Sequence, residues 1–90
     1  MRERDLERFT TMFIKSRGGL ALKFISPGYA GLPDRLVLMP GGQMCFVELK
    51  APGGKPRPLQ MRRIEQLRAL GFKVYVVHRK EEIGGIINAL

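Results

Sequence analysis

The chain has 90 residues, which suits a single domain over residues 1–90 with a thin hydrophobic core that association with a second copy would enlarge. Its 16 lysines and arginines exceed its 8 acidic residues, so the net charge of +8 favours a polyanionic partner, nucleic acid first and an anionic membrane second. No apolar run reaches the length of a membrane span, the charged N-terminus is unlike a signal peptide, and the single cysteine excludes an internal disulfide. We therefore expect a cytoplasmic protein, in a host cell if it is viral, that is not secreted.

The first half of the chain predicts one helix followed by three strands. Apolar residues at positions 6, 9, 13 and 14 predict an amphipathic helix over residues 2–17, which the Gly18-Gly19 pair ends. Apolar runs then predict strands over residues 20–25, 35–39 and 44–49, separated by loops rich in proline and glycine. Cys45 lies within the last of these strands, where we expect an inert core thiol.

The second half predicts a helix, a strand and a short final helix. After a segment rich in proline and glycine, the helix runs from about Pro58 to Leu70, with apolar residues at positions 59, 64, 67 and 70 as its core stripe. A β-branched run over residues 73–78 predicts the fourth strand, and residues 81–90 form a last helix weakened by Gly84-Gly85. The order α-β-β-β-α-β, with the final helix added, indicates an α/β fold with a central mixed sheet flanked by helices.

The hairpin between the second and third strands decides whether two acidic residues meet. With a two-residue Gly41-Gly42 loop, Glu48 would point to the opposite side of the sheet from Asp34, because side chains alternate along a strand. With a three-residue loop that begins at Pro40, Asp34 lies directly opposite Glu48 on one face. Lys50 follows two residues later on the same strand, so it shares the face of Glu48.

In the second register, two carboxylates and an ammonium group share a small area. Asp34 and Glu48 would repel each other at a few Å, and a divalent cation between them would remove that repulsion. Their hard oxygen atoms suit Mg²⁺ or Mn²⁺. The alternative is that Asp34, Glu48 and Lys50 are simply solvated at the strand ends. The presence of all three residues, together with the turn and the basic net charge, favours a metal-dependent site.

The motif that carries these residues resembles a nuclease motif. Pro33-Asp34, followed fourteen residues later by Glu48-Leu49-Lys50, resembles the PD-(D/E)XK pattern. The wider segments GLPDRLVL, FVELKAPGGKPRPLQ and GFKVYVV resemble the virus-type replication-repair nuclease family, VRR-NUC, from Glu7 to about Ile83. The resemblance implies a restriction-endonuclease-like core in a single VRR-NUC-like domain, which agrees with the element order above.

The resemblance also implies which residues hold the metal. Asp34 and Glu48 match the metal-binding carboxylates of the family, and both positions keep the expected residue type. Glu7, on the first helix, matches an acidic residue that can support the metal site, although Glu3 lies one turn away and could substitute. The backbone carbonyl of Leu49, between the motif glutamate and lysine, is a further candidate ligand.

Lys50 and Gln60 are the remaining catalytic residues that the resemblance implies. Two adjacent carboxylates favour the charged form of a lysine, so we expect Lys50 to orient groups and stabilise charge while water activated by the metal attacks. A role for Lys50 as general base stays open. Gln60, at the start of the second helix, would orient Lys50 or the water, or it would serve only as a polar residue at a helix N-terminus.

Basic and aromatic residues along the chain are expected to bind the DNA backbone, which gives a salt-dependent term in the affinity. The candidates are Lys23, Tyr29, Arg35, Lys55, Arg57, Arg62 and Arg63. Each basic residue alone could be solvated surface, and Tyr29 could instead cover the core. His78 has no Cys or His partner and is not expected to bind a metal, and Gly53-Gly54-Lys55 lacks the other positions of a phosphate-binding P-loop.

These features predict a Mg²⁺- or Mn²⁺-dependent endonuclease that is selective for branched DNA such as four-way (Holliday) junctions. The resemblance implies a homodimer, and a two-fold dimer suits a two-fold junction. The apolar stripe of the last segment or of the first helix could supply the dimer face. The alternatives are a nuclease or nickase of linear duplex DNA, a non-catalytic basic nucleic-acid-binding module, and a small basic component of a larger assembly.

Overall fold

The computed structural model describes all 90 residues and contains the predicted seven elements in the predicted order. The boundaries differ from the sequence-based ones by a few residues at most, because the strand ends fray into loops. The elements are α1 (Glu3–Ser16), β1 (Leu20–Lys23), β2 (Arg35–Met39), β3 (Gln43–Leu49), α2 (Pro58–Ala69), β4 (Val74–Val77) and α3 (Glu81–Asn88), with a 3₁₀ turn at Pro40–Gly42. None of the helices combines the length and the apolar character needed to cross a membrane.

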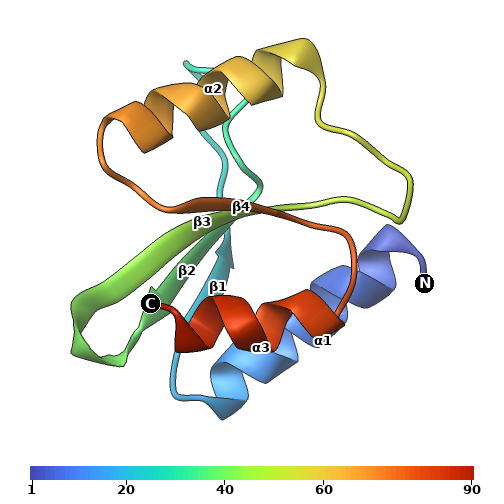
Figure 1. Cartoon of the computed structure of the whole chain (residues 1–90), viewed down its shortest axis with the longest axis vertical. Coiled ribbons are helices and arrows are strands. Elements are labelled where there is room, and N and C mark those ends of the chain that lie inside the picture. Colours follow the sequence, from blue (N-terminus) through green and yellow to red (C-terminus); the bar gives the residue numbers. More distant parts are fainter.

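The four strands form one mixed sheet in the order β1-β2-β3-β4. The pairs β1–β2 and β2–β3 are antiparallel, and α2 carries the chain across to β4, which pairs with β3 in parallel. Helices α1 and α3 lie on one face of the sheet and α2 lies on the other (Figure 1). This arrangement confirms the predicted α/β fold with a mixed central sheet.

The two faces of the sheet are buried to different extents. The α1/α3 face holds a cluster of eight buried residues: Leu6, Ile14, Val37, Cys45, Val47, Leu49, Val77 and Ile83. The α2 face holds only three, Phe46, Ile64 and Val74. Burial raises the pKa of the Cys45 thiol to about 11, which keeps it protonated and agrees with the expected inert core thiol.

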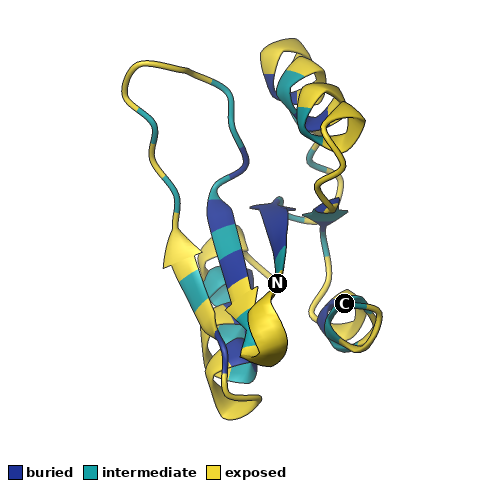
Figure 2. Ribbon diagram, turned by 90° about the vertical axis from the view of Figure 1, so that its left-hand side faces the viewer, coloured by how far each residue is buried: buried dark blue, intermediate teal, exposed yellow.

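Several apolar stripes differ from the sequence-based expectations. The stripes of α1 and α3, expected to offer a dimer face, instead fill the core of the chain itself. On α2 the expected stripe is wrong at both ends, since Leu59 is 37% exposed and Leu70 is 71% exposed. The apolar residues left exposed on the sheet lie on its outer strand and the next one: Leu20, Leu22 and Leu38 (Figure 2).

The hairpin adopts the three-residue loop. Met39 pairs with Gln43, so Pro40, Gly41 and Gly42 form the turn. Gly41 and Gly42 have φ angles of 81° and 78°, a left-handed conformation that favours glycine at both positions. The next pairs up the ladder end with Arg35 opposite Val47, which brings the residues just beyond them, Asp34 and Glu48, together.

Candidate active site

Asp34 and Glu48 face each other where β2 begins and β3 ends. The backbone N–H of Asp34 donates to Oε1 of Glu48 at 3.1 Å, and the backbone N–H of Leu49 donates to Oδ1 of Asp34 at 3.1 Å. Each strand therefore uses its main chain to fix the carboxylate of the other. The position of both side chains follows from the sheet register, not from a flexible loop.

The two carboxylates lie in a site that is largely removed from water. Glu48 is 2% exposed, and the Asp34 side chain is 29% exposed. Burial and the charge of Glu48 raise the pKa of Asp34 to about 6, against its ordinary value of 3.8, although the Leu49 hydrogen bond acts in the opposite direction. A cation at this position would oppose both of the effects that disfavour the Asp34 carboxylate.

Lys50 and Gln60 both reach the second oxygen of Glu48. The Lys50 ammonium lies 3.0 Å from Oε2 of Glu48, and Nε2 of Gln60 donates to the same atom at 3.1 Å. Oε1 of Gln60 accepts a hydrogen bond from the backbone N–H of Arg57 at 2.8 Å, which also fixes the first turn of α2. The structure thus brings together four of the predicted site residues, Asp34, Glu48, Lys50 and Gln60, in one connected set of contacts.

The donor set of this site suits a hard divalent cation. Asp34 and Glu48 supply carboxylate oxygens, the ligand type that Mg²⁺ and Mn²⁺ prefer, and Mg²⁺ commonly takes only one or two carboxylates with water and phosphate oxygens as the rest. Oδ2 of Asp34 lies 3.9 Å from the Arg35 guanidinium and accepts no hydrogen bond from the protein. No group of three or more His, Cys, Asp or Glu side chains converges on one point, and Glu7 stays a predicted supporting residue. The carbonyl of Leu49 stays a predicted ligand.

Glu7 lies beside this site but is paired with Arg35. The Arg35 guanidinium lies 3.4 Å from Oε2 of Glu7 and donates to the backbone carbonyl of Asp34 at 3.1 Å. Arg35 is only 8% exposed, because its position in β2 points it toward α1, so it does not belong with the surface cations expected to contact phosphates. Its contacts indicate that it supports the Asp34 backbone, with Glu7 balancing its charge.

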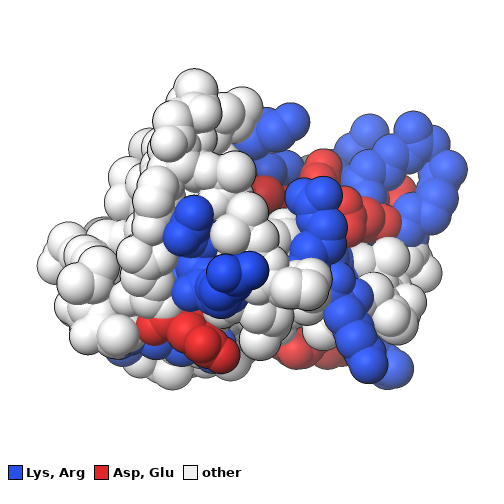
Figure 3. All heavy atoms as spheres, turned by 90° about the horizontal axis from the view of Figure 1, so that it is seen from above, with Lys and Arg blue, Asp and Glu red and all other residues white.

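The other predicted DNA-binding residues divide into two groups. Lys23, Lys55, Arg57 and Arg62 are exposed, and the view from the α2 side shows lysines and arginines with acidic groups among them (Figure 3). Tyr29 and Arg63 instead contact each other: the guanidinium lies 3.8 Å from the ring centre, and Nε of Arg63 donates to the carbonyl of Ala30 at 2.9 Å. This contact holds the loop before Pro33 against α2. Local sequence pattern gives no sign of this contact, because the partners lie 34 residues apart.

Comparisons with known proteins identify the family. A sequence model of the VRR-NUC domain matches residues 5–81. A protein of Acyrthosiphon pisum secondary endosymbiont phage 1, named "Putative nuclease p44", is 43% identical over 90 residues, which are all of this chain and 96% of that protein. A solved structure described as a VRR_NUC domain matches with a TM-score of 0.87 and 33% identity, over 96% of this chain and 94% of that one. The chain therefore belongs to the VRR-NUC domain family.

Proposed function

We propose that this chain is a divalent-metal-dependent endonuclease that hydrolyses phosphodiester bonds in branched DNA, with four-way junctions as the preferred substrate. The observation that carries the proposal is the contact set of Asp34, Glu48, Lys50 and Gln60 at one edge of the sheet. The family match and the name of the phage relative support a nuclease. Two acids facing a polyanion, one buried and one partly buried, would only weaken a binding module, whereas a metal-dependent nuclease requires them.

Each residue of the site has a separate task in this proposal. Asp34 and Glu48 would hold Mg²⁺ or Mn²⁺, which when bound supplies a more acidic water and polarises a phosphoryl oxygen. The Lys50 ammonium, whose side chain is 20% exposed, is placed to stabilise negative charge that builds on the phosphate. Gln60 holds Glu48 in orientation through its amide, and Arg35 fixes the Asp34 backbone.

Selectivity for branched DNA rests on shape and symmetry in this proposal. The exposed cations can position phosphates, and the structure offers no helix or strand that projects as a base reader. A second copy of the chain would place two such sites around a two-fold axis, which matches paired cuts in a junction. The exposed leucines on one face of β1 and β2, Leu20, Leu22 and Leu38, are the apolar surface that such a dimer would cover.

The test is cleavage of an end-labelled four-way junction and of a linear duplex with the same sequences. Wild type, Lys50→Ala and the control Lys15→Ala, which removes an exposed lysine of α1, are each incubated with Mg²⁺, Mn²⁺ or EDTA. We expect paired, symmetric cuts in the junction by wild type and by the control, at least about a hundredfold slower with Lys50→Ala and absent in EDTA.

Three other outcomes would contradict parts of the proposal. Equal cleavage of the linear duplex would remove selectivity for branches and leave a general nuclease. Cleavage that persists in EDTA would contradict the proposed dependence on a divalent metal. Binding without cleavage in every metal would leave a basic binding module, with the buried acids unexplained.

A further inference from the structure

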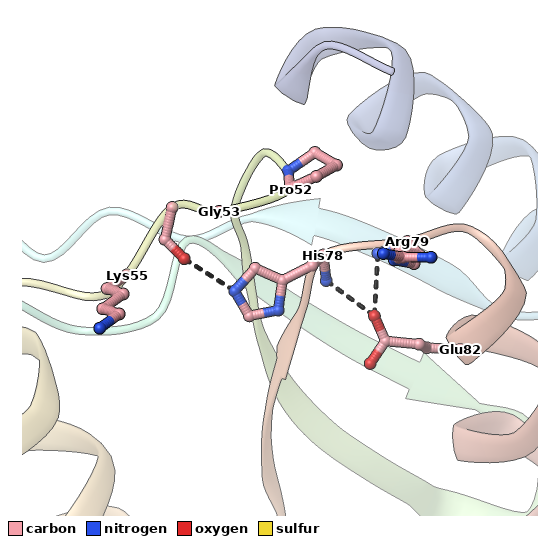
Figure 4. Close-up of a pocket in the computed structure, with 7 residues that line it drawn as sticks. Pro52, Gly53, Lys55, His78, Arg79 and Glu82 are labelled. Carbon is pink, nitrogen blue, oxygen red and sulfur yellow. Dashed lines mark hydrogen bonds between the residues drawn. The ribbon is translucent and has the colours of Figure 1, made fainter.

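A hollow lies at the ends of β3 and β4, outside the contact set of the carboxylates. It has a volume of about 490 Å³ and is formed by the loop after β3 and by the segment that joins β4 to α3 (Figure 4). Its lining includes a lysine, an arginine, a histidine and a glutamate, so a ligand there would meet charged and polar side chains. Its lining residues are Pro52, Gly53, Gly54, Lys55, His78, Arg79 and Glu82.

This hollow adjoins the candidate catalytic lysine. Gly54 lies beside Lys50, because a Cβ atom built on Gly54 would lie 3.5 Å from the Cβ of Lys50. The backbone N–H of Lys50 donates to the carbonyl of Val77 at 2.9 Å, and His78 follows Val77 directly. A polymer held at the active site would therefore pass next to the hollow.

His78 fixes the loop that closes the hollow. Its Nε2 lies 2.8 Å from the carbonyl oxygen of Gly54, which can only accept, so Nε2 carries the hydrogen of this bond (Figure 4). The bond joins the loop after β3 to the end of β4. It holds Gly54 near Lys50 and fixes the position of the glycine-rich loop relative to the site.

The charges around the hollow favour an anion. Lys55 lies on one side of His78 and Arg79 on the other, and both cations are exposed (Figure 4). The one acidic lining residue, Glu82, already accepts hydrogen bonds through Oε1 from the backbone N–H groups of His78 and Arg79, each at 2.9 Å. The side chains of Lys55 and Arg79 form no hydrogen bond or ion pair within the chain.

We propose that this hollow binds a phosphate that neighbours the cut phosphate on the same DNA strand. Lys55 and Arg79 are its cations, and His78 is the residue that positions the loop. This inference rests on the proposed function and adds to it a defined path for the strand. The cut phosphate lies at the carboxylates and Lys50, and a neighbouring phosphate lies across Gly54 in the hollow. The strand then leaves the active site toward α3, not along α2.

The first test is binding of a fluorescent four-way junction in EDTA, where cleavage is not expected. The variant Lys55→Ala/Arg79→Ala is compared with Lys15→Ala/Arg17→Ala, which removes the same two charge types from the far end of α1. We expect the first double variant to bind about tenfold more weakly than the second at ~0.1 M salt. The slope of its log affinity against log salt concentration should also be shallower, by the amount that about one phosphate contact contributes. Equal affinities of the two double variants would overturn the proposal.

The second test places the phosphate on the strand. Single neutral methylphosphonate linkages are moved through the nucleotides that flank the cut. We expect one position, within about two nucleotides of the cut, at which the neutral linkage weakens wild type binding but adds no further loss to Lys55→Ala/Arg79→Ala. A uniform loss along the strand, the same in both proteins, would overturn the subsite.

The two proposals fail in different ways. If wild type protein does not cut any DNA in Mg²⁺ or Mn²⁺, the proposed function fails whatever the binding data show. If wild type cuts the junction but the methylphosphonate scan has no position-specific effect, only the subsite fails. Thermal melting of both double variants checks that the fold is kept, which is expected because all four side chains are exposed.

Discussion

The two faces of the central sheet bury different kinds of residue. The α1/α3 face buries eight apolar residues, whereas the α2 face buries three apolar residues together with Glu48 and Gln60. Strand β3 serves both faces, because alternate residues point to opposite sides. A well-filled face can supply the free energy of folding that the other face loses by holding two carboxylates close together. The side chains of β3 that stabilise the fold therefore point to one face, and those of the candidate site point to the other.

The largest expected effect falls on the α2 face. Glu48→Gln keeps the size of the side chain but removes the charge that faces Lys50 and the metal. Its single amide oxygen can accept from only one of the two present donors, the Asp34 N–H and Nε2 of Gln60. We expect cleavage to slow by about a thousandfold with little change in the folded structure, since the removed charge is the most buried one in the site. The measurement is single-turnover cleavage of a junction. Glu65→Gln, an exposed position on α2, is the matched control and is expected to cleave normally.

The opposite result is expected on the α1/α3 face. Leu6 is 1% exposed in the larger cluster, so Leu6→Ala removes buried methyl groups and leaves a cavity. We expect the free energy of unfolding in urea to fall by about 3 kcal/mol. Met12→Ala on the same helix, where Met12 is 64% exposed, should change it by less than about 0.5 kcal/mol. A similar loss in both variants would mean that the two faces do not differ as described.

Asp34→Asn sharpens the comparison because it is expected to raise stability while it removes activity. The folded-state pKa of Asp34 is raised to about 6 from 3.8, so the folded protein binds a proton more tightly than the unfolded chain does. Stability is therefore lost as the pH rises from about 4 through about 6, and it stays low above that range. In EDTA we expect Asp34→Asn to be more stable than wild type by about 1 kcal/mol at pH 7.5, after allowance for solvent screening, and equal to it below pH 4.

The control for this pH dependence has the opposite sign. The hydrogen bond from the Arg2 backbone lowers the pKa of the exposed Asp5, so Asp5→Asn should not stabilise the protein at any pH. Urea unfolding at several pH values between 4 and 7.5 measures both variants. A gain for Asp34→Asn that does not change with pH would show that repulsion between carboxylates is not its source.

The smallest expected effect concerns a polar group on the apolar face. Thr10 is fully buried on α1, and its hydroxyl has no hydrogen-bond partner. Thr10→Val keeps the shape and removes the unsatisfied group, so we expect a gain of about 1 kcal/mol in the free energy of unfolding. The neighbouring Thr11 is exposed and its hydroxyl donates to the Glu7 carbonyl, so Thr11→Val should give no gain. Equal gains in both variants would point to a general preference for valine and not to the buried hydroxyl.

Much of the fold and the centre of the site could be predicted from the sequence. Apolar periodicity placed all seven elements, and the three-residue loop was one of two registers that the hairpin sequence allowed. What local pattern could not do was choose between them, because Gly41-Gly42 closes either loop. The burial of Glu48 also depends on α2, which lies far away in the sequence and covers that part of the sheet only in the folded chain.

The rest of the site depended on contacts between elements. Arg35 looks like a surface cation in the sequence, yet strand alternation points it toward α1, where its guanidinium contacts Glu7 and the Asp34 carbonyl. The positions of Leu6, Ile14 and Arg35 could have suggested this pairing, since α1 presents one side to the same face of β2. On α2, Gln60 and Ile64 are the buried positions, and a stripe drawn from apolar residues alone cannot include a glutamine.

Gln60 also links the motion of a helix to the state of the site. Its amide oxygen accepts from the Arg57 N–H at the start of α2, and its amide nitrogen donates to Glu48. The first turn of a helix is normally among the first parts of a protein to open in hydrogen exchange. Here that opening would also release Glu48, so local fraying of α2 and loosening of the carboxylate become one event. Slow exchange of the Arg57 amide would therefore report directly on how firmly the Glu48 carboxylate is held.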